Sequence, residues 1–202
     1  MDIRLCNCRI HPLFAFVLTL ALLLDTSGVL FFSLLATLMH ESGHLVLLRL
    51  WKRSVRQISF TPFGIQIEAE QSLVTGYREE LLIAAGGPAV NILLFLACWP
   101  IFLSCNVQVV GLFAVANLVV GAINLMPISG MDGCDITLCI LRLLALDEPS
   151  IIATLRLLSF LFAFMLSLVT FLLILQIKLN ISLIFLLVYV LFVILQQEQA
   201  LY

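Results

Sequence analysis

Residues 29–50 read VLFFSLLATLMHESGHLVLLRL and decide the fold of this chain. The stretch is almost entirely apolar, and it is long enough to cross a bilayer, since a membrane-spanning helix needs about 20 mostly apolar residues. Its one acidic residue, Glu41, lies between His40 and His44. An ionisable side chain near the centre of such a helix costs about 2.5–3.5 kcal/mol on insertion scales and is rare there unless it has a function. The stretch therefore indicates a membrane helix that carries a chemical site.

The whole chain has the composition of a membrane protein. It is 202 residues long, 63% hydrophobic and 11% charged, with a mean hydropathy of +1.20. Soluble domains average about 45–50% apolar and about 25% charged residues. A disordered chain, a disulfide-stapled secreted domain and a nucleic-acid binder are excluded, because low hydrophobicity, dense cysteines and a basic excess are all absent.

Six segments are long and apolar enough to be membrane spans. The first is short, and a signal peptide is the alternative, but the residues that follow it lack a small-residue cleavage motif. We therefore predict an all-α polytopic membrane protein, with about six transmembrane helices in a single domain over residues 1–202. The spans lie near residues 11–24, 29–50, 81–105, 107–126, 151–176 and 179–197.

The basic residues predict the orientation, because Lys and Arg accumulate on the cytosolic side of short loops. With six spans and a cytosolic N-terminus, nine of the ten basic residues fall inside and Lys178 alone falls outside. Both termini are then cytosolic, in a multi-pass protein of a cell membrane that we expect to be bacterial. The nine are Arg4, Arg9, Arg49, Lys52, Arg53, Arg56, Arg78, Arg142 and Arg156.

Residues 55–70 are the patterned stretch outside the spans. Apolar and polar residues alternate on both sides of Pro62-Phe63-Gly64. Such alternation around a Pro/Gly pair predicts a β-hairpin with one apolar face. We expect it to lie at the membrane interface, and the alternative is an edge strand that pairs with an extended peptide.

His40-Glu41-Ser42-Gly43-His44 has the H-E-x-x-H spacing of zinc hydrolases. Residues four apart on an α-helix lie about 40° apart around the axis and about 6 Å along it, so both imidazoles can bind one zinc ion. Glu41 can take a proton from water at the open position of the metal. The alternatives are a chance match and a purely structural polar cluster.

Catalytic zinc needs a third protein ligand, and the segment after the fourth span offers candidates. We expect Pro127, Gly130 and Gly133 to break the helix and free Asp132 to reach the metal. Asp135 and Cys134 compete for this role, and a solvated loop acid is the plain alternative for Asp132. Asn91, Asn117, Asn124 and Asp132 could line a path for water, while helix–helix hydrogen bonds are the alternative for each asparagine.

Three ordered motifs resemble the site-2 protease family of intramembrane zinc metalloproteases. They are His40 to His44, Ala85-Gly86-Gly87-Pro88-Ala89-Val90-Asn91, and Asn124 to Gly133. The six-span layout, Ile10-His11-Pro12 and Pro62-Phe63-Gly64 further resemble the stage IV sporulation membrane protease branch of that family. The family usually has Leu-Asp-Gly where this chain has Met131-Asp132-Gly133, a conservative change.

The resemblance implies residue roles. His40, His44 and Asp132 would bind Zn²⁺, Glu41 would be the general base and then the proton donor, and Asn124, Phe63 and Gly64 would contact the substrate. No appended peptide-binding or nucleotide-sensing domain is expected, because the segments left for one are too short.

The leading hypothesis is an intramembrane zinc endopeptidase that cleaves a membrane-tethered protein near the cytosolic face. A sigma-factor precursor or an anti-sigma factor would be such a substrate, and a membrane protein in trans could regulate the enzyme. A small multi-span metal-ion transporter is the alternative, since intramembrane His, Glu and Asp also mark ion pathways. Transporters usually have two related halves, and no duplication is visible in this sequence.

Overall fold

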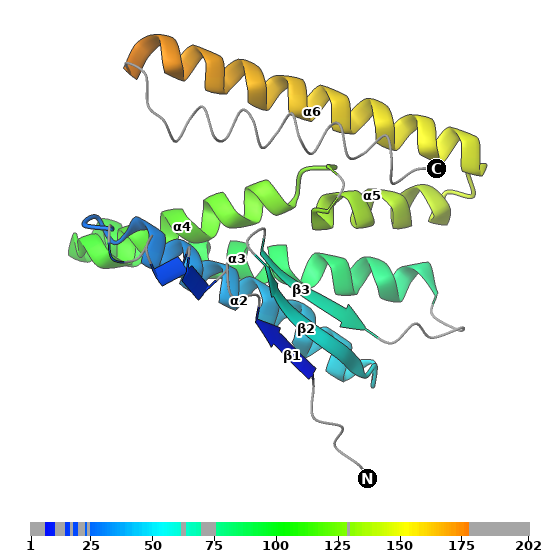
Figure 1. The fold of residues 1–202 in the computed structure, drawn as a ribbon, viewed down its shortest axis with the longest axis horizontal. Helices are drawn as coiled ribbons and strands as arrows, with labels where there is room; N and C mark the ends of the chain where they lie inside the picture. Colours follow the sequence, from blue (N-terminus) through cyan, green and yellow to red (C-terminus); the bar gives the residue numbers. More distant parts are fainter. Residues whose placement is uncertain are drawn as a thin grey trace. The chain divides into compact units, whose positions relative to one another are not determined.

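The computed structural model describes residues 7–10, 15–16, 18–19, 23, 25–61, 64–69, 76–128 and 130–177 (Figure 1). The predicted span 179–197 lies outside the described residues, and most of the predicted span 11–24 does too. The chain forms two compact units, Met1–Ile123 and Asn124–Tyr202.

Helix α2, Val29–Leu50, belongs to the first unit and coincides with the predicted span 29–50. Its start is fixed by Asp25, whose carboxylate accepts hydrogen bonds from the backbone N–H groups of Leu30 and Phe31 at 2.9 and 3.2 Å. The Ser27 hydroxyl also donates to this carboxylate and, with the backbone donors, lowers the pKa of Asp25. A charged carboxylate at this end is favourable because the N-terminus of a helix carries partial positive charge.

Helix α3, Tyr77–Cys105, packs closely against α2. The two backbones approach at glycines: a Cβ on Gly43 would lie 2.4 Å from the carbonyl oxygen of Gly86. Small residues at such a crossing let two membrane helices come together. The helix covers the predicted span 81–105 and begins four residues earlier, where Glu79 and Glu80 occupy its first turn.

Helix α4, Gln108–Asn124, is shorter than the predicted span 107–126. Its 17 residues extend for roughly 26 Å at about 1.5 Å per residue, less than the hydrocarbon core of about 30 Å. Residues 125–128 and 130–131 are not helical, and Gly130 has a φ of +87°. The predicted helix break is therefore confirmed at Pro127 and Gly130.

A three-stranded sheet accompanies these helices in the first unit (Figure 1). Strands β2, Val55–Thr61, and β3, Gly64–Ala69, are antiparallel, so the predicted hairpin is confirmed. Strand β1, Asn7–Ile10, runs parallel to β2 on its other side. The sequence does not predict this third strand, because four residues are too few for a clear alternation and their partner lies far along the chain.

The second unit contains helices α5, Asp132–Leu143, and α6, Glu148–Ile177. Gly133 lies inside α5, so the expectation that this glycine breaks the helix is wrong. Helix α6 covers the predicted span 151–176, and buried residues recur every four positions along it. This spacing aligns them on one face of the helix. They are Ile151, Leu155, Ser159 and Ala163.

The outward faces of the helices are apolar. Leu93 and Leu96 on α3 and Leu157 on α6 are 65%, 59% and 60% exposed. Among the described residues, α2, α3 and the Glu148–Val169 part of α6 are long and apolar enough to cross a membrane. The protein is thus a multi-span membrane protein with five described helices and a small sheet.

Candidate metal centre

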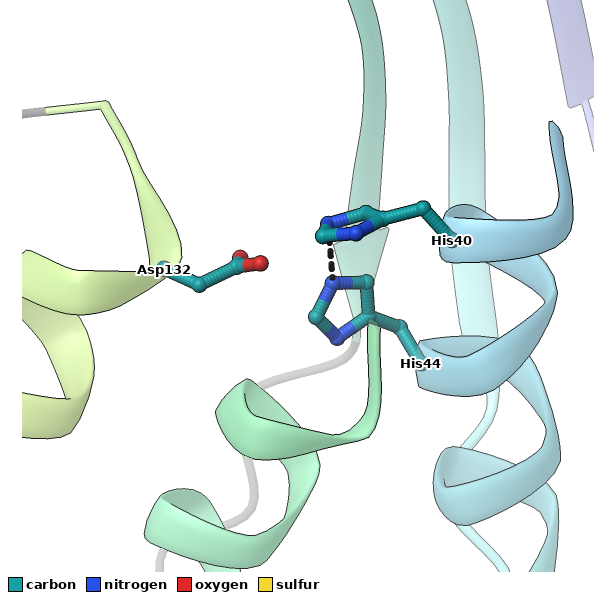
Figure 2. A group of neighbouring side chains, drawn as sticks. All are labelled: His40, His44 and Asp132. Carbon is teal, nitrogen blue, oxygen red and sulfur yellow. Dashed lines mark hydrogen bonds between the residues drawn. The ribbon is translucent and has the colours of Figure 1, made fainter. Parts of the chain in front are cut away.

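Helix α2 places the imidazoles of His40 and His44 beside each other (Figure 2). Their Nε2 atoms are 3.3 Å apart, and their ring planes are inclined by 74°. His40 is 2% exposed and His44 is half-buried. The pairing predicted from the four-residue spacing is therefore present in the structure.

Each imidazole is anchored through its other nitrogen. Nδ1 of His44 lies 2.8 Å from the backbone carbonyl oxygen of Ile83, and Nδ1 of His40 lies 3.0 Å from Oδ1 of Asn91. Because an oxygen of this kind only accepts hydrogen bonds, each Nδ1 carries the proton of its ring. In the neutral ring, Nε2 then presents a lone pair.

The two Nε2 atoms face each other at 3.3 Å, a distance at which either a shared proton or a metal ion can lie between them. Two nitrogens bound to one tetrahedral zinc ion at about 2.0–2.1 Å lie roughly 3.3–3.4 Å apart. The Nε2 separation of 3.3 Å in the protein agrees with that value. The histidine pair therefore fits a tetrahedral zinc ion in both its donor chemistry and its spacing.

Gly87 on α3 keeps the space in front of these nitrogens open. A Cβ at this position would lie 2.4 Å from Nε2 of His44 and 2.6 Å from Nε2 of His40. Even the smallest side chain would occupy the place where the lone pairs converge. The glycine at residue 87 is therefore part of the site.

Asp132 is the first residue of α5 and is half-buried. The start of this helix lies against the preceding turn, because a Cβ on Gly133 would lie 2.2 Å from the carbonyl oxygen of Leu125. Asp132, which Figure 2 draws together with the two histidines, is the residue of the second unit that the sequence predicts as the third ligand.

The two competitors for the third position, Cys134 and Asp135, also lie on α5. Asp135 is exposed to solvent. Burial raises the pKa of the Cys134 thiol, and the charge of Asp135 raises it further.

The other predicted site residues lie on separate elements. Glu41 follows His40 on α2 and is half-buried, and Asn124 is the half-buried last residue of α4. Gly64 is the first residue of β3, while Phe63 lies outside the described residues.

Sequence reasoning did not assign Gly87 and Asn91 to the metal centre. Both lie in the Gly86 to Asn91 run of α3, and their four-residue spacing gives them the same helix face. An asparagine one turn after a glycine in an apolar span is the signal that could have identified them.

The chain is similar to known proteins in sequence and in fold. No protein-family model matches the chain. Stage IV sporulation protein FB of Bacillus subtilis (strain 168) is 30% identical over 130 residues, which are 62% of this chain and 44% of that protein. The chain thus matches less than half the length of this relative.

The fold is that of a solved structure, the site-2 protease from Methanocaldococcus jannaschii. The TM-score is 0.62 at 20% sequence identity, and the match covers 98% of this chain and 92% of the other. The chain is thus similar in sequence to a stage IV sporulation protein and in fold to a site-2 protease.

Proposed function

We propose that the chain is a zinc-dependent intramembrane endopeptidase and that residues 1–202 act as a single protease domain. The observation that carries this proposal is the pair of Nε2 atoms on His40 and His44, held 3.3 Å apart by imidazoles that are anchored through Nδ1. Asp132 is proposed as the third ligand. His40, His44 and Asp132 would hold the ion, and water or substrate would complete its coordination, as in catalytic zinc sites.

The residues of the chain divide the chemistry among them. Zinc, when bound, would polarise the scissile carbonyl and lower the pKa of a bound water. Glu41, next to His40 on α2, takes a proton from the attacking water and later gives it to the leaving amine. Asn124 holds the substrate or donates a hydrogen bond to the carbonyl oxygen as negative charge develops there.

The substrate is proposed to be a membrane-tethered protein that presents an extended segment. Strand β3 is the last strand in the order β1-β2-β3 of the described sheet, and it begins at Gly64. An edge strand can pair with an extended peptide through backbone hydrogen bonds. Gly64, the first residue of this strand, would then contact the substrate, and Phe63, which precedes it in the sequence, is proposed to do so too.

The cellular setting is proposed from charge and from the relative. The distribution of Lys and Arg favours cytosolic termini in a bacterial cell membrane, with cleavage near the cytosolic face. A sigma-factor precursor or an anti-sigma factor is proposed as the substrate. A second membrane protein could regulate the enzyme in trans.

Replacing Glu41 by Gln separates binding from chemistry. The protein in detergent should keep about one zinc ion per chain, while cleavage falls by about 10²-fold or more because the general base is lost. The readout is the set of membrane-tethered proteins that accumulate uncut in cells that express the variant. Glu79→Gln, the same change in the first turn of α3, is the matched control and should cleave normally.

Two results would contradict the proposal. One is normal cleavage by Glu41→Gln. The other is zinc flux into liposomes that is equal for the wild type and Glu41→Gln, without any cleavage, which would favour the transporter.

A further inference from the structure

Asn91 is fully buried, at 0% exposure, and its side-chain amide contacts helices on two sides. Its Oδ1 lies 3.0 Å from Nδ1 of His40 on α2. Its Nδ2 donates to the backbone carbonyl oxygen of Ala36 at 3.4 Å, also on α2, and to that of Asn117 on α4 at 3.3 Å. The chemistry of these partners decides which end of the amide faces the histidine.

A carbonyl oxygen only accepts hydrogen bonds, so the end of the amide that faces two carbonyls must be the NH₂ group. The opposite end, which faces His40, is therefore the oxygen. That oxygen in turn only accepts, so the proton of the neutral His40 ring lies on Nδ1. Nε2 is left as the nitrogen that can bind a metal.

The amide of Asn91 cannot easily move away from this position. A Cβ on Gly121 would lie 3.1 Å from Cβ of Asn91, so α4 closes over the asparagine from the other side. The carbonyl of Ala36 lies one helical turn before His40, which ties the amide to the same helix that carries the ligand. Asn91 is thus fixed relative to the imidazole that it contacts.

The two histidines differ in the kind of anchor that they use. His44 is held by the backbone carbonyl of Ile83, which no substitution removes, whereas His40 is held by a side chain. Groups that hold the second nitrogen of a metal-bound imidazole fix its tautomer and orientation, and their loss typically costs about 10–100-fold in metal affinity. The side chain at residue 91 can therefore change how tightly His40 binds a metal ion.

We propose that Asn91 is a positioning residue for the metal centre: its side-chain oxygen holds His40 in the Nδ1-protonated tautomer and so sets the affinity for zinc. The metal part of this inference rests on the proposed function, because it takes His40 as a ligand. The tautomer part concerns the metal-free protein and can be measured by itself.

The plain alternative is that Asn91 serves only to join α3 to α2 and α4. Substitutions separate the two roles, because the acceptor Oδ1 faces the histidine and the donor Nδ2 faces the backbone of the helices. Asn91→Asp keeps an acceptor toward His40 and loses the NH₂ donor. Asn91→Leu keeps the approximate volume and loses both groups.

Asn117→Leu is the matched control for damage to packing. Asn117 is also a fully buried asparagine, and its Nδ2 donates to the carbonyl oxygen of Phe113 on its own helix. Its backbone carbonyl, which accepts from Asn91, remains in the variant. We expect Asn117→Leu to lower stability and to leave the tautomer of His40 and the zinc affinity at their wild-type values.

The experiment is ¹⁵N NMR of the histidine rings in the metal-free, detergent-solubilised full chain, at a pH where the rings are neutral, followed by zinc titration against a competing chelator. The chain has three histidines, and a His11→Gln background leaves only the pair of interest. We expect a protonated Nδ1 on His40 in the wild type, in Asn91→Asp and in Asn117→Leu. In Asn91→Leu this preference should be lost, with zinc bound about 10–100-fold more weakly.

Two results would overturn the inference. One is a protonated Nε2 on His40 in the wild type, a measurement that needs no variant to fold. The other is a folded Asn91→Leu protein with an unchanged tautomer and unchanged zinc affinity. A wild-type protein that binds zinc with the expected spectrum but cleaves nothing would refute the protease proposal and still support the role of Asn91.

Discussion

A Cβ on Gly87 would lie 2.4 Å from Nε2 of His44, the atom that is proposed to bind the metal. Two helices therefore build this part of the site. Helix α2 carries the two imidazole nitrogens, and Gly87 on α3 leaves the space in front of them open. Position 87 is thus tied to metal binding and not only to the packing of α3.

Gly87→Ala should abolish tight zinc binding, because its methyl group would fill the space between the two imidazoles. The loss should exceed the roughly 10–100-fold that removal of a ligand-supporting group costs. Zinc content after purification in detergent is the measurement. Gly76→Ala is the matched control: a Cβ on Gly76 would meet no atom within 4 Å, so this variant should keep its zinc. Full zinc occupancy in Gly87→Ala would contradict the site.

Gly43→Ala should act on stability, because its methyl group would meet the Gly86 carbonyl oxygen at 2.4 Å. Backbone atoms cannot step aside, so α2 and α3 must separate, at a cost of about 1–3 kcal/mol for overpacking of this kind. Thermal unfolding of the metal-free protein measures the change. An unchanged unfolding temperature would show that the two helices do not touch at these glycines.

The sequence predicts the parts of this protein that local patterns encode. Helix α2, its two histidines and the hairpin of β2 and β3 follow from apolar length, four-residue spacing and two-residue alternation. Strand β1 depends on pairing between distant segments, and four residues carry too little pattern to indicate it.

The turn and helix around Asp132 are a different case. The sequence suggests that the helix break continues through Gly133, yet this glycine lies within α5 because it allows the helix to lie against the backbone of Leu125. The glycine serves close packing there and not a turn. Similarly, the role of Asn91 depends on which groups of α2 and α4 meet its amide, and a sequence pattern does not contain that information.

Ser159→Ala should weaken the turn that precedes α5. The hydroxyl of Ser159 on α6 is buried and donates to the carbonyl oxygen of Pro127. Its loss leaves a buried carbonyl without this donor, which typically costs about 1–3 kcal/mol. Ser104→Ala removes a similar bond, from the Ser104 hydroxyl to the Pro100 carbonyl, at an exposed site and should be nearly neutral. Equal unfolding temperatures for the two variants would show that the hydrogen bond from Ser159 to Pro127 does not stabilise this turn.

Asp132→Asn tests the third ligand. An amide oxygen is a much weaker zinc ligand than a carboxylate, so zinc affinity should fall strongly and cleavage should disappear.

Asp135→Asn makes the same chemical change three residues further along α5, at an exposed position, and should leave zinc and cleavage nearly intact. Cys134→Ser should also keep its zinc, because Asp132 and not Cys134 is the proposed third ligand. Zinc titration and cleavage, measured in parallel on the three variants, show which of the three residues is the third ligand. Loss of zinc in Asp135→Asn or Cys134→Ser, with Asp132→Asn unaffected, would move the ligand along α5 and leave the histidine pair and the reaction class in place.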